Sequence, residues 1–227
     1  MILFIIFLLL TILLPACFLF LALTQKKSKD RFSFRSYFSY ELFPPKESKL
    51  YYPLRVLEGL SLLTGILPGL YGLFAIQQFD LNYSLFFVGL SLAGIIAPLG
   101  QYFLSYIDLS FAKQHLSLFC VTGIGEILFC GMSGFYFAAV YRNLRDVFSL
   151  IVTIFLFLGL FASVLLLINP KLKDWAKLEK SVSEDGSVSY CRPKRFVLPY
   201  SEWVLYFVAI LNNLIALIGL YFLTINR

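Results

Sequence analysis

Six long apolar segments run through this chain of 227 residues, and the connectors between them carry most of its charge. Each segment has about 20 mostly apolar residues, the length that an α-helix needs to cross about 30 Å of hydrocarbon. The segments are 2–24, 56–76, 84–107, 117–141, 148–168 and 204–224. This pattern predicts an all-α integral membrane protein, a bundle of six transmembrane helices that forms a single membrane domain over residues 1–227.

The composition excludes an ordinary soluble domain. Hydrophobic residues make up 59% of the chain and charged residues only 14%, with a mean hydropathy of +0.82. An average soluble domain has about 25% charged residues. Six spans leave room only for connectors, of which 25–55 and 169–203 are the longest. The lipid bilayer is therefore the first partner that we expect.

Basic residues gather on alternate connectors. If all six segments cross the membrane, connectors 25–55, 108–116 and 169–203 share one side, and they hold sixteen of the nineteen lysines and arginines. The positive-inside rule places that side in the cytoplasm. We therefore expect a protein of a bacterial cytoplasmic membrane, with both termini outside. The same distribution argues against nucleic acid as the reason for the net charge of +6.

The first segment is expected to remain as a membrane anchor. No lysine or arginine precedes Lys26, and the apolar run exceeds the 7–15 residues of a signal-peptide core. The stretch 14–17 has the small residue and cysteine of a lipoprotein cleavage site. However, Pro15 is unusual at that place and apolar sequence resumes at Phe18. We therefore favour an uncleaved helix over a lipoprotein.

The connector 169–203 is the part most able to form a small structure outside the membrane. Asn169-Pro170 is typical of a helix start, and the residues after it alternate apolar side chains with lysines, as in a short helix lying on a membrane surface. Asp185-Gly186 then stands between two short alternating runs, which indicates a β-hairpin. This connector either docks a protein partner or is a solvated link that only sets orientation.

Aromatic residues are interleaved with basic and hydroxyl residues in 31–40. Beside a span, this mixture is typical of a membrane interface, where rings settle at the headgroups and cations meet anionic lipid. Prolines interrupt the first three spans, and Pro68 and Pro98 stand in similar glycine-rich settings. Paired breaks of this kind indicate either a transport site or close helix packing, and the GxxxG pair at Gly65 and Gly69 favours packing.

Glu126 is the residue most out of place. It is the tenth residue of the fourth segment, so it lies roughly 13 Å into the bilayer, where an acidic residue costs about 2.5–3.5 kcal/mol. Asn212 and Asn213 stand at the same depth in the sixth segment, which runs in the same direction. We expect an amide to hydrogen-bond the carboxyl. The cluster is either a proton or cation site or a structural hydrogen bond between helices.

The remaining polar residues indicate no catalytic group, metal or cofactor. The four cysteines form no CxxC pair and no zinc spacing. His115, the single histidine, stands at the edge of a span and is expected to be a satisfied interfacial residue. Glu58, near the start of the second segment, is expected either to reach the interface or to pair with Arg55.

One short stretch resembles a known family. Gly131-Met132-Ser133-Gly134 and the following residues 135–138 resemble the GxSG element of rhomboid intramembrane serine proteases. The resemblance implies a six-helix bundle with Ser133 as the nucleophile on the fourth span. That family also needs a histidine base on the sixth span, where this chain has only Asn212 and Asn213. The resemblance covers about eight residues.

These observations favour a membrane protein without catalytic activity. Its role is either transport-related, with Glu126, Asn212 and Asn213 as a midplane polar or ion site, or that of a subunit or scaffold that binds a partner through 169–203. The alternative is an intramembrane serine hydrolase, or a catalytically dead rhomboid-like protein, built around Ser133.

Overall fold

The six-helix bundle is confirmed. The computed structural model describes residues 1–25, 32–75, 81–107, 111–174, 179–182, 188–191 and 197–225. Its long helices are α1 (Ile2–Gln25), α2 (Tyr51–Leu63), α3 (Leu67–Ala75), α4 (Leu81–Leu104), α5 (Ala112–Leu144), α6 (Val147–Leu167) and α7 (Val197–Ile225). The second span consists of α2 and α3 together, so six helical segments are long and apolar enough to cross a membrane. The protein is a multi-pass membrane protein.

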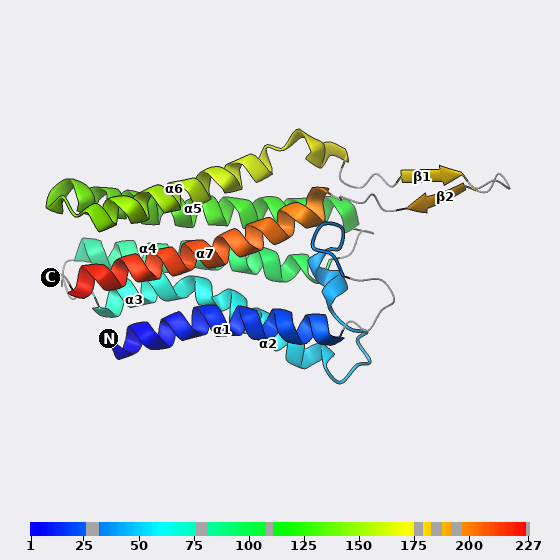
Figure 1. Cartoon of the computed structure of the whole chain (residues 1–227), viewed down its shortest axis with the longest axis horizontal. Helices are drawn as coiled ribbons and strands as arrows, with labels where there is room; N and C mark the ends of the chain where they lie inside the picture. The colour runs from blue at the N-terminus through cyan, green and yellow to red at the C-terminus, as the bar shows by residue number, and fades with distance from the viewer. Residues whose placement is uncertain are drawn as a thin grey trace.

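Both termini lie at one end of the bundle, and the two long connectors lie at the other (Figure 1). The end with the connectors is called the basic end below, because 25–55 and 169–203 hold most of the lysines and arginines. The first connector contains a short 3₁₀ helix, η1 (Ser39–Leu42), which packs beside the start of α7. This arrangement agrees with an even number of membrane crossings.

Helices α2 and α7 begin earlier than the apolar segments predict. The predicted starts were 56 and 204, whereas the helices begin at Tyr51 and Val197. Pro53 and Pro199 each stand in the first turn, where a missing N–H costs nothing because no helical carbonyl would accept it. The early start of α7 brings Glu202 into the bundle, where the sequence had assigned it to a connector.

The glycine-rich breaks serve close packing. A 3₁₀ turn, η2 (Thr64–Ile66), interrupts the second span just before Pro68. Gly65 and Gly94 lie face to face, since a Cβ on either one would overlap the other's carbonyl oxygen. Pro98 lies against Gly65 as well. These contacts let α4 approach the second span closely. They agree with the interpretation that the glycine-rich settings of Pro68 and Pro98 serve helix packing.

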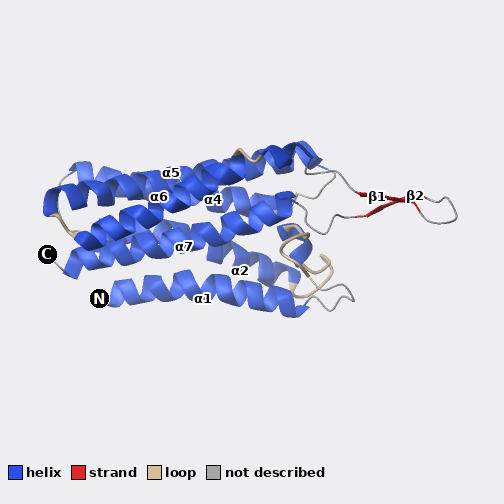
Figure 2. Ribbon diagram, turned by 45° about the horizontal axis from the view of Figure 1, so that its top comes forward, coloured by secondary structure: helices blue, strands red, loops and turns tan. Residues whose placement is uncertain are grey.

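The connector 169–203 has a hairpin, as predicted. β1 (Glu179–Val182) pairs antiparallel with β2 (Val188–Cys191), and Val182 lies opposite Val188. The predicted Asp185-Gly186 turn lies outside the described residues. Both strands stand beyond the ends of the helices (Figures 1 and 2).

The predicted surface helix after Asn169 is only partly described. The structure has a short 3₁₀ helix, η4 (Pro170–Asp174), and residues 175–178 lie outside the described part. Asn169 caps it by accepting a hydrogen bond from the Lys171 N–H at 3.0 Å. Leu172 is buried and belongs to the same apolar cluster as Phe38, Leu104 and Phe119, so it packs into the bundle and does not face a membrane surface.

Candidate functional site

Glu126 lies in the interior of the bundle, near the middle of α5. Its side chain is 2% exposed. Its Oε1 atom accepts a hydrogen bond from Asn212 Nδ2 at 2.6 Å and another from the Cys130 thiol at 3.1 Å. Among the described residues no lysine, arginine or histidine forms an ion pair with this carboxyl. The acid is therefore held by two neutral donors.

The room for Asn212 is provided by α6. A Cβ on Gly159 would overlap the amide of Asn212, including both of its terminal atoms. The absence of a side chain at residue 159 thus lets the amide lie between α6 and the carboxyl on α5. The sequence predicted Glu126 and an asparagine at one depth, but gave no signal for the glycine that makes their approach possible.

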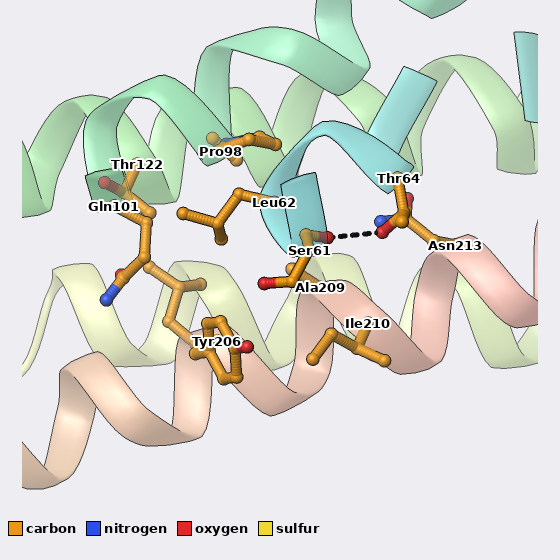
Figure 3. Close-up of a pocket in the computed structure, with 12 residues that line it drawn as sticks. Ser61, Leu62, Thr64, Pro98, Gln101, Thr122, Tyr206, Ala209, Ile210 and Asn213 are labelled. Carbon is orange, nitrogen blue, oxygen red and sulfur yellow. Dashed lines mark hydrogen bonds between the residues drawn. The ribbon is translucent and has the colours of Figure 1, made fainter. Parts of the chain in front are cut away.

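Asn213 does not share the contact with Glu126. Consecutive helical residues point about 100° apart, because a turn has 3.6 residues. The side chain of Asn213 therefore lines a different space, a cavity between α2, α4, α5 and α7 (Figure 3). The sequence treated the two asparagines as equivalent, and the structure separates them into one partner of the acid and one wall of the cavity.

The cavity is partly polar and small. It has about 20 Å³ of space for the centres of water molecules. Most of its lining surface is apolar, although six of the twelve residues that line it have polar side chains: Ser61, Thr64, Gln101, Thr122, Tyr206 and Asn213. Gln101 comes from α4 and Tyr206 from α7, and both side chains extend into the gap between these helices (Figure 3). The sequence did not single out this set, because its members are scattered over four helices.

A buried ion pair lies nearer the basic end. Arg55 and Glu58 on α2 are 6% and 3% exposed, and Arg55 Nη1 donates to Glu58 Oε2 at 3.1 Å. Arg55 Nη2 also donates to the carbonyl of Ser105 at 2.7 Å, and the Ser105 hydroxyl donates to Glu58 Oε2 at 3.0 Å. Of the two sequence expectations for Glu58, pairing with Arg55 is thus the one present.

Aromatic rings enclose the charge of Arg55. The guanidinium carbon lies 3.4 Å from the ring centre of Phe43 and 3.9 Å from that of Tyr106. Phe43 belongs to the first connector and Tyr106 follows α4, so one side chain joins three segments. Such stacking suits the flat, weakly hydrated guanidinium and would not suit a lysine.

His115 and Glu202 form a second buried pair. His115 Nε2 lies 2.5 Å from Glu202 Oε1, and His115 Nδ1 lies 2.8 Å from the carbonyl oxygen of Ile107. The rings of Phe38 and Tyr40, in the first connector, pack edge-on against the imidazole. The histidine is thus satisfied, as the sequence suggested, but it is fully buried and its partner was missed.

Ser133 has no base beside it in the described structure. Its side chain is buried, and its hydroxyl oxygen has no hydrogen-bond partner among the described residues. His115 stands eighteen residues earlier on the same helix, roughly 27 Å away along the axis, and is bound to Glu202. The rhomboid-like activity of the GxSG stretch thus stays a hypothesis without a catalytic partner. The described residues also contain no group of three metal-binding side chains.

Comparisons with protein-family models, with curated proteins and with solved structures find no match to this chain. The functional argument therefore rests on the geometry of these buried polar groups.

Proposed function

We propose that this protein is a transport-related membrane protein without catalytic activity, in which the carboxyl of Glu126 binds and releases a proton within the bilayer. The observation that carries the proposal is a fully buried acid whose hydrogen bonds come from Asn212 and Cys130, both neutral. Ionisable residues at such depth are costly and usually mark a proton or ion pathway.

A proton fits this site better than a metal ion. The groups that contact Glu126 Oε1 are an amide N–H and a thiol S–H, so both present hydrogens to the carboxyl. A bound metal ion needs several oxygen, nitrogen or sulfur lone pairs around it. A proton, in contrast, needs only one free lone pair on the carboxyl.

The proposal includes the orientation expected from the charge. Sixteen of nineteen lysines and arginines belong to connectors that meet at the basic end. We assign that end to the cytoplasm and both termini to the outside of a bacterial cytoplasmic membrane. Proton movement through Glu126 then connects the cytoplasm with the outer face.

Proton flux into proteoliposomes tests the function. A pH-sensitive dye trapped inside reports the internal pH after a step in external pH, with the wild-type protein, Glu126→Gln and Glu47→Gln compared. Glu47 is an exposed connector residue, so its variant controls for the substitution itself. The proposal predicts equal flux for the wild type and Glu47→Gln, and loss of flux for Glu126→Gln. Wild-type flux in Glu126→Gln would overturn it.

A second candidate role is that of a subunit or scaffold, and the hairpin favours it. The strands β1 and β2 stand beyond the helix ends (Figure 2), and an isolated two-stranded sheet has two unpaired edges on which an added strand can pair. Deletion of residues 181–191 should then release a co-purifying protein while the six helices still insert. Retention of every partner would argue against this role.

A further inference from the structure

A groove lies between the end of α1 and the first turns of α2, at the basic end of the bundle. Its volume is about 570 Å³, within the range of about 300–1,000 Å³ that sites for small ligands have. Its lining is almost wholly apolar. Leu54 is buried, whereas Val56 and Leu60 are exposed, so this α1–α2 groove opens on the outer surface of the bundle.

The polar side chains of the α1–α2 groove stand at its basic end. Helix α1 runs toward that end and α2 runs away from it (Figure 1). Gln25 and Tyr52 therefore lie outermost among the lining residues, and Leu21, Leu57 and Leu60 lie deeper. Tyrosine is typical of the headgroup level of a membrane, because its ring is apolar and its tip is polar. The groove thus has one polar end and one apolar end, as a lipid has.

The length of the α1–α2 groove matches one leaflet of a bilayer. Leu50 and Leu60 line its two ends on α2, and ten residues of helix span roughly 15 Å. This is half of the hydrocarbon thickness of about 30 Å. A helix from a second copy of the chain would cross the whole thickness, whereas an acyl chain occupies one leaflet. The length therefore favours a lipid as the occupant.

Positive charge surrounds the basic end of the α1–α2 groove. Residues 46–49 lead directly to Leu50, and their two lysines and one glutamate are all exposed. Helix α2 then begins without a side-chain cap, so the N–H groups of its first turn add partial positive charge. In the sequence Gln25 is followed directly by Lys26 and Lys27, which lie outside the described residues. This charge is complementary to a phosphate headgroup.

We propose that the α1–α2 groove binds one anionic phospholipid, with an acyl chain along Leu54, Leu57 and Leu60 and the phosphate beside Lys49. Lipid tails are as apolar as leucine, so the acyl chain gains no hydrophobic energy by leaving the bulk bilayer. The preference for this lipid comes from its headgroup, since basic pockets between helices bind anionic headgroups. The site does not depend on Glu126 or on the proposed function.

Native mass spectrometry of the whole chain tests the site, because it counts the lipids that stay bound to each molecule. Phosphatidylglycerol and phosphatidylcholine with identical acyl chains serve as probes, so only the headgroup differs, anionic in the first and neutral overall in the second. The proposal predicts that one phosphatidylglycerol binds in preference to phosphatidylcholine. Equal binding of the two lipids would overturn the proposal, and so would a complex of two chains that excludes the lipid.

A tryptophan at residue 60 tests whether the α1–α2 groove holds the acyl chain. Leu60→Trp fills the groove, whereas Leu158→Trp makes the same change on α6, on the other side of the bundle from α1 (Figures 1 and 2). Both leucines are exposed, so neither change alters the core. We expect Leu60→Trp to lose the preferred lipid and Leu158→Trp to keep it. Unchanged binding in Leu60→Trp would overturn the proposal, because the headgroup alone would then be held.

A lysine variant tests the contact with the headgroup. Lys49→Gln removes one charge beside the α1–α2 groove, and Lys171→Gln removes one from the exposed residue that follows α6 at the same end of the bundle. A lysine near an anionic surface accounts for about fivefold in binding. We expect phosphatidylglycerol to bind about fivefold more weakly to Lys49→Gln and as before to Lys171→Gln. Equal weakening in both variants would overturn the proposal, because the lipid would then respond only to the overall charge.

Discussion

Glu126 on α5 accepts a 2.6 Å hydrogen bond from Asn212 on α7, and this bond crosses the centre of the bundle. Glu126 is the fifteenth of 33 residues in its helix and Asn212 the sixteenth of 29 in its own. The contact therefore joins the two helices near their midpoints. It satisfies an acid at the depth where an unsatisfied one would be most costly.

The two residues should be energetically coupled. Asn212→Leu leaves the carboxyl with the thiol of Cys130 alone, and we expect a loss of about 1–3 kcal/mol in the free energy of unfolding. Glu126→Leu combined with Asn212→Leu removes both polar groups, so it should cost less than the two single changes added together. Hydrogen bonds between membrane helices give coupling energies of about 0.6 kcal/mol, and up to about 1.7 kcal/mol. Unfolding in detergent measures the cycle, and strictly additive changes would contradict the contact.

Gly159 should be intolerant of a side chain. Gly159→Ala places a methyl group on the amide of Asn212, and overpacking of this kind costs about 1–3 kcal/mol. Gly131→Ala is the matched control, since its Cβ would meet Leu160 Cδ1 at 3.6 Å, an ordinary contact distance. We expect the thermal midpoint in detergent to fall for Gly159→Ala and to change little for Gly131→Ala. Equal midpoints would mean that Asn212 does not lie against α6.

Arg55→Lys should destabilise the bundle although the charge is kept. The lysine cannot reproduce the stacking between Phe43 and Tyr106 or the paired hydrogen bonds to Ser105. We expect a loss of about 1–2 kcal/mol, the range of a largely desolvated cation–π contact. The exposed Arg142→Lys serves as the control and should unfold like the wild type. A stable Arg55→Lys protein would show that charge alone is required there.

The turn between α5 and α6 should respond to acid. The side-chain hydrogen bond from Ser149 lowers the pKa of Asp146, which caps α6 and also accepts from the N–H groups of Phe148 and Ser149. A lowered pKa stabilises the fold above the unfolded value of about 3.9, and this stabilisation is lost as the pH falls through the folded value.

Asp146→Ala should therefore cost roughly 1 kcal/mol at neutral pH, and this cost should shrink in acid. Asp146→Asn keeps a capping side chain without the charge, so it should stay close to the wild type at neutral pH and lose the acid dependence. Unfolding midpoints in detergent at neutral pH and below about pH 3 measure both effects. An Asp146→Ala protein with the same deficit at both pH values would contradict the account of the cap.

In this protein the sequence predicts well how deep a residue lies in the membrane, and predicts poorly which way its side chain points about the helix axis. The lengths of the spans and the placement of charge can be read along the chain. The six helices and the common membrane depth of Glu126 and Asn212 therefore follow from counting residues. Which of Asn212 and Asn213 meets the acid depends on the angle of α7 about its own axis. That angle is set by packing, here by the missing side chain of Gly159.

The sequence did not predict the contacts of Glu202 with His115 and of Ser105 with Arg55, and the reason is similar. Glu202 lies in the part of α7 that precedes its apolar run, so the sequence assigned it to a connector, away from His115. Ser105 meets Arg55 fifty residues away in the chain, and neither residue signals the other. Pairs that form across helices are specified by the whole bundle, which is why local patterns did not reveal them.

The most direct test of the central claim is infrared difference spectroscopy of the protein in lipid during a pH titration. The carbonyl band of a protonated carboxylic acid reports a proton on the group, and Glu126→Gln identifies the part of the band that belongs to residue 126. The account predicts a carboxyl band that titrates in the wild type, shifts in Asn212→Leu and is absent in Glu126→Gln. An identical titration in the wild type and Glu126→Gln would contradict it, because Glu126 would then exchange no proton.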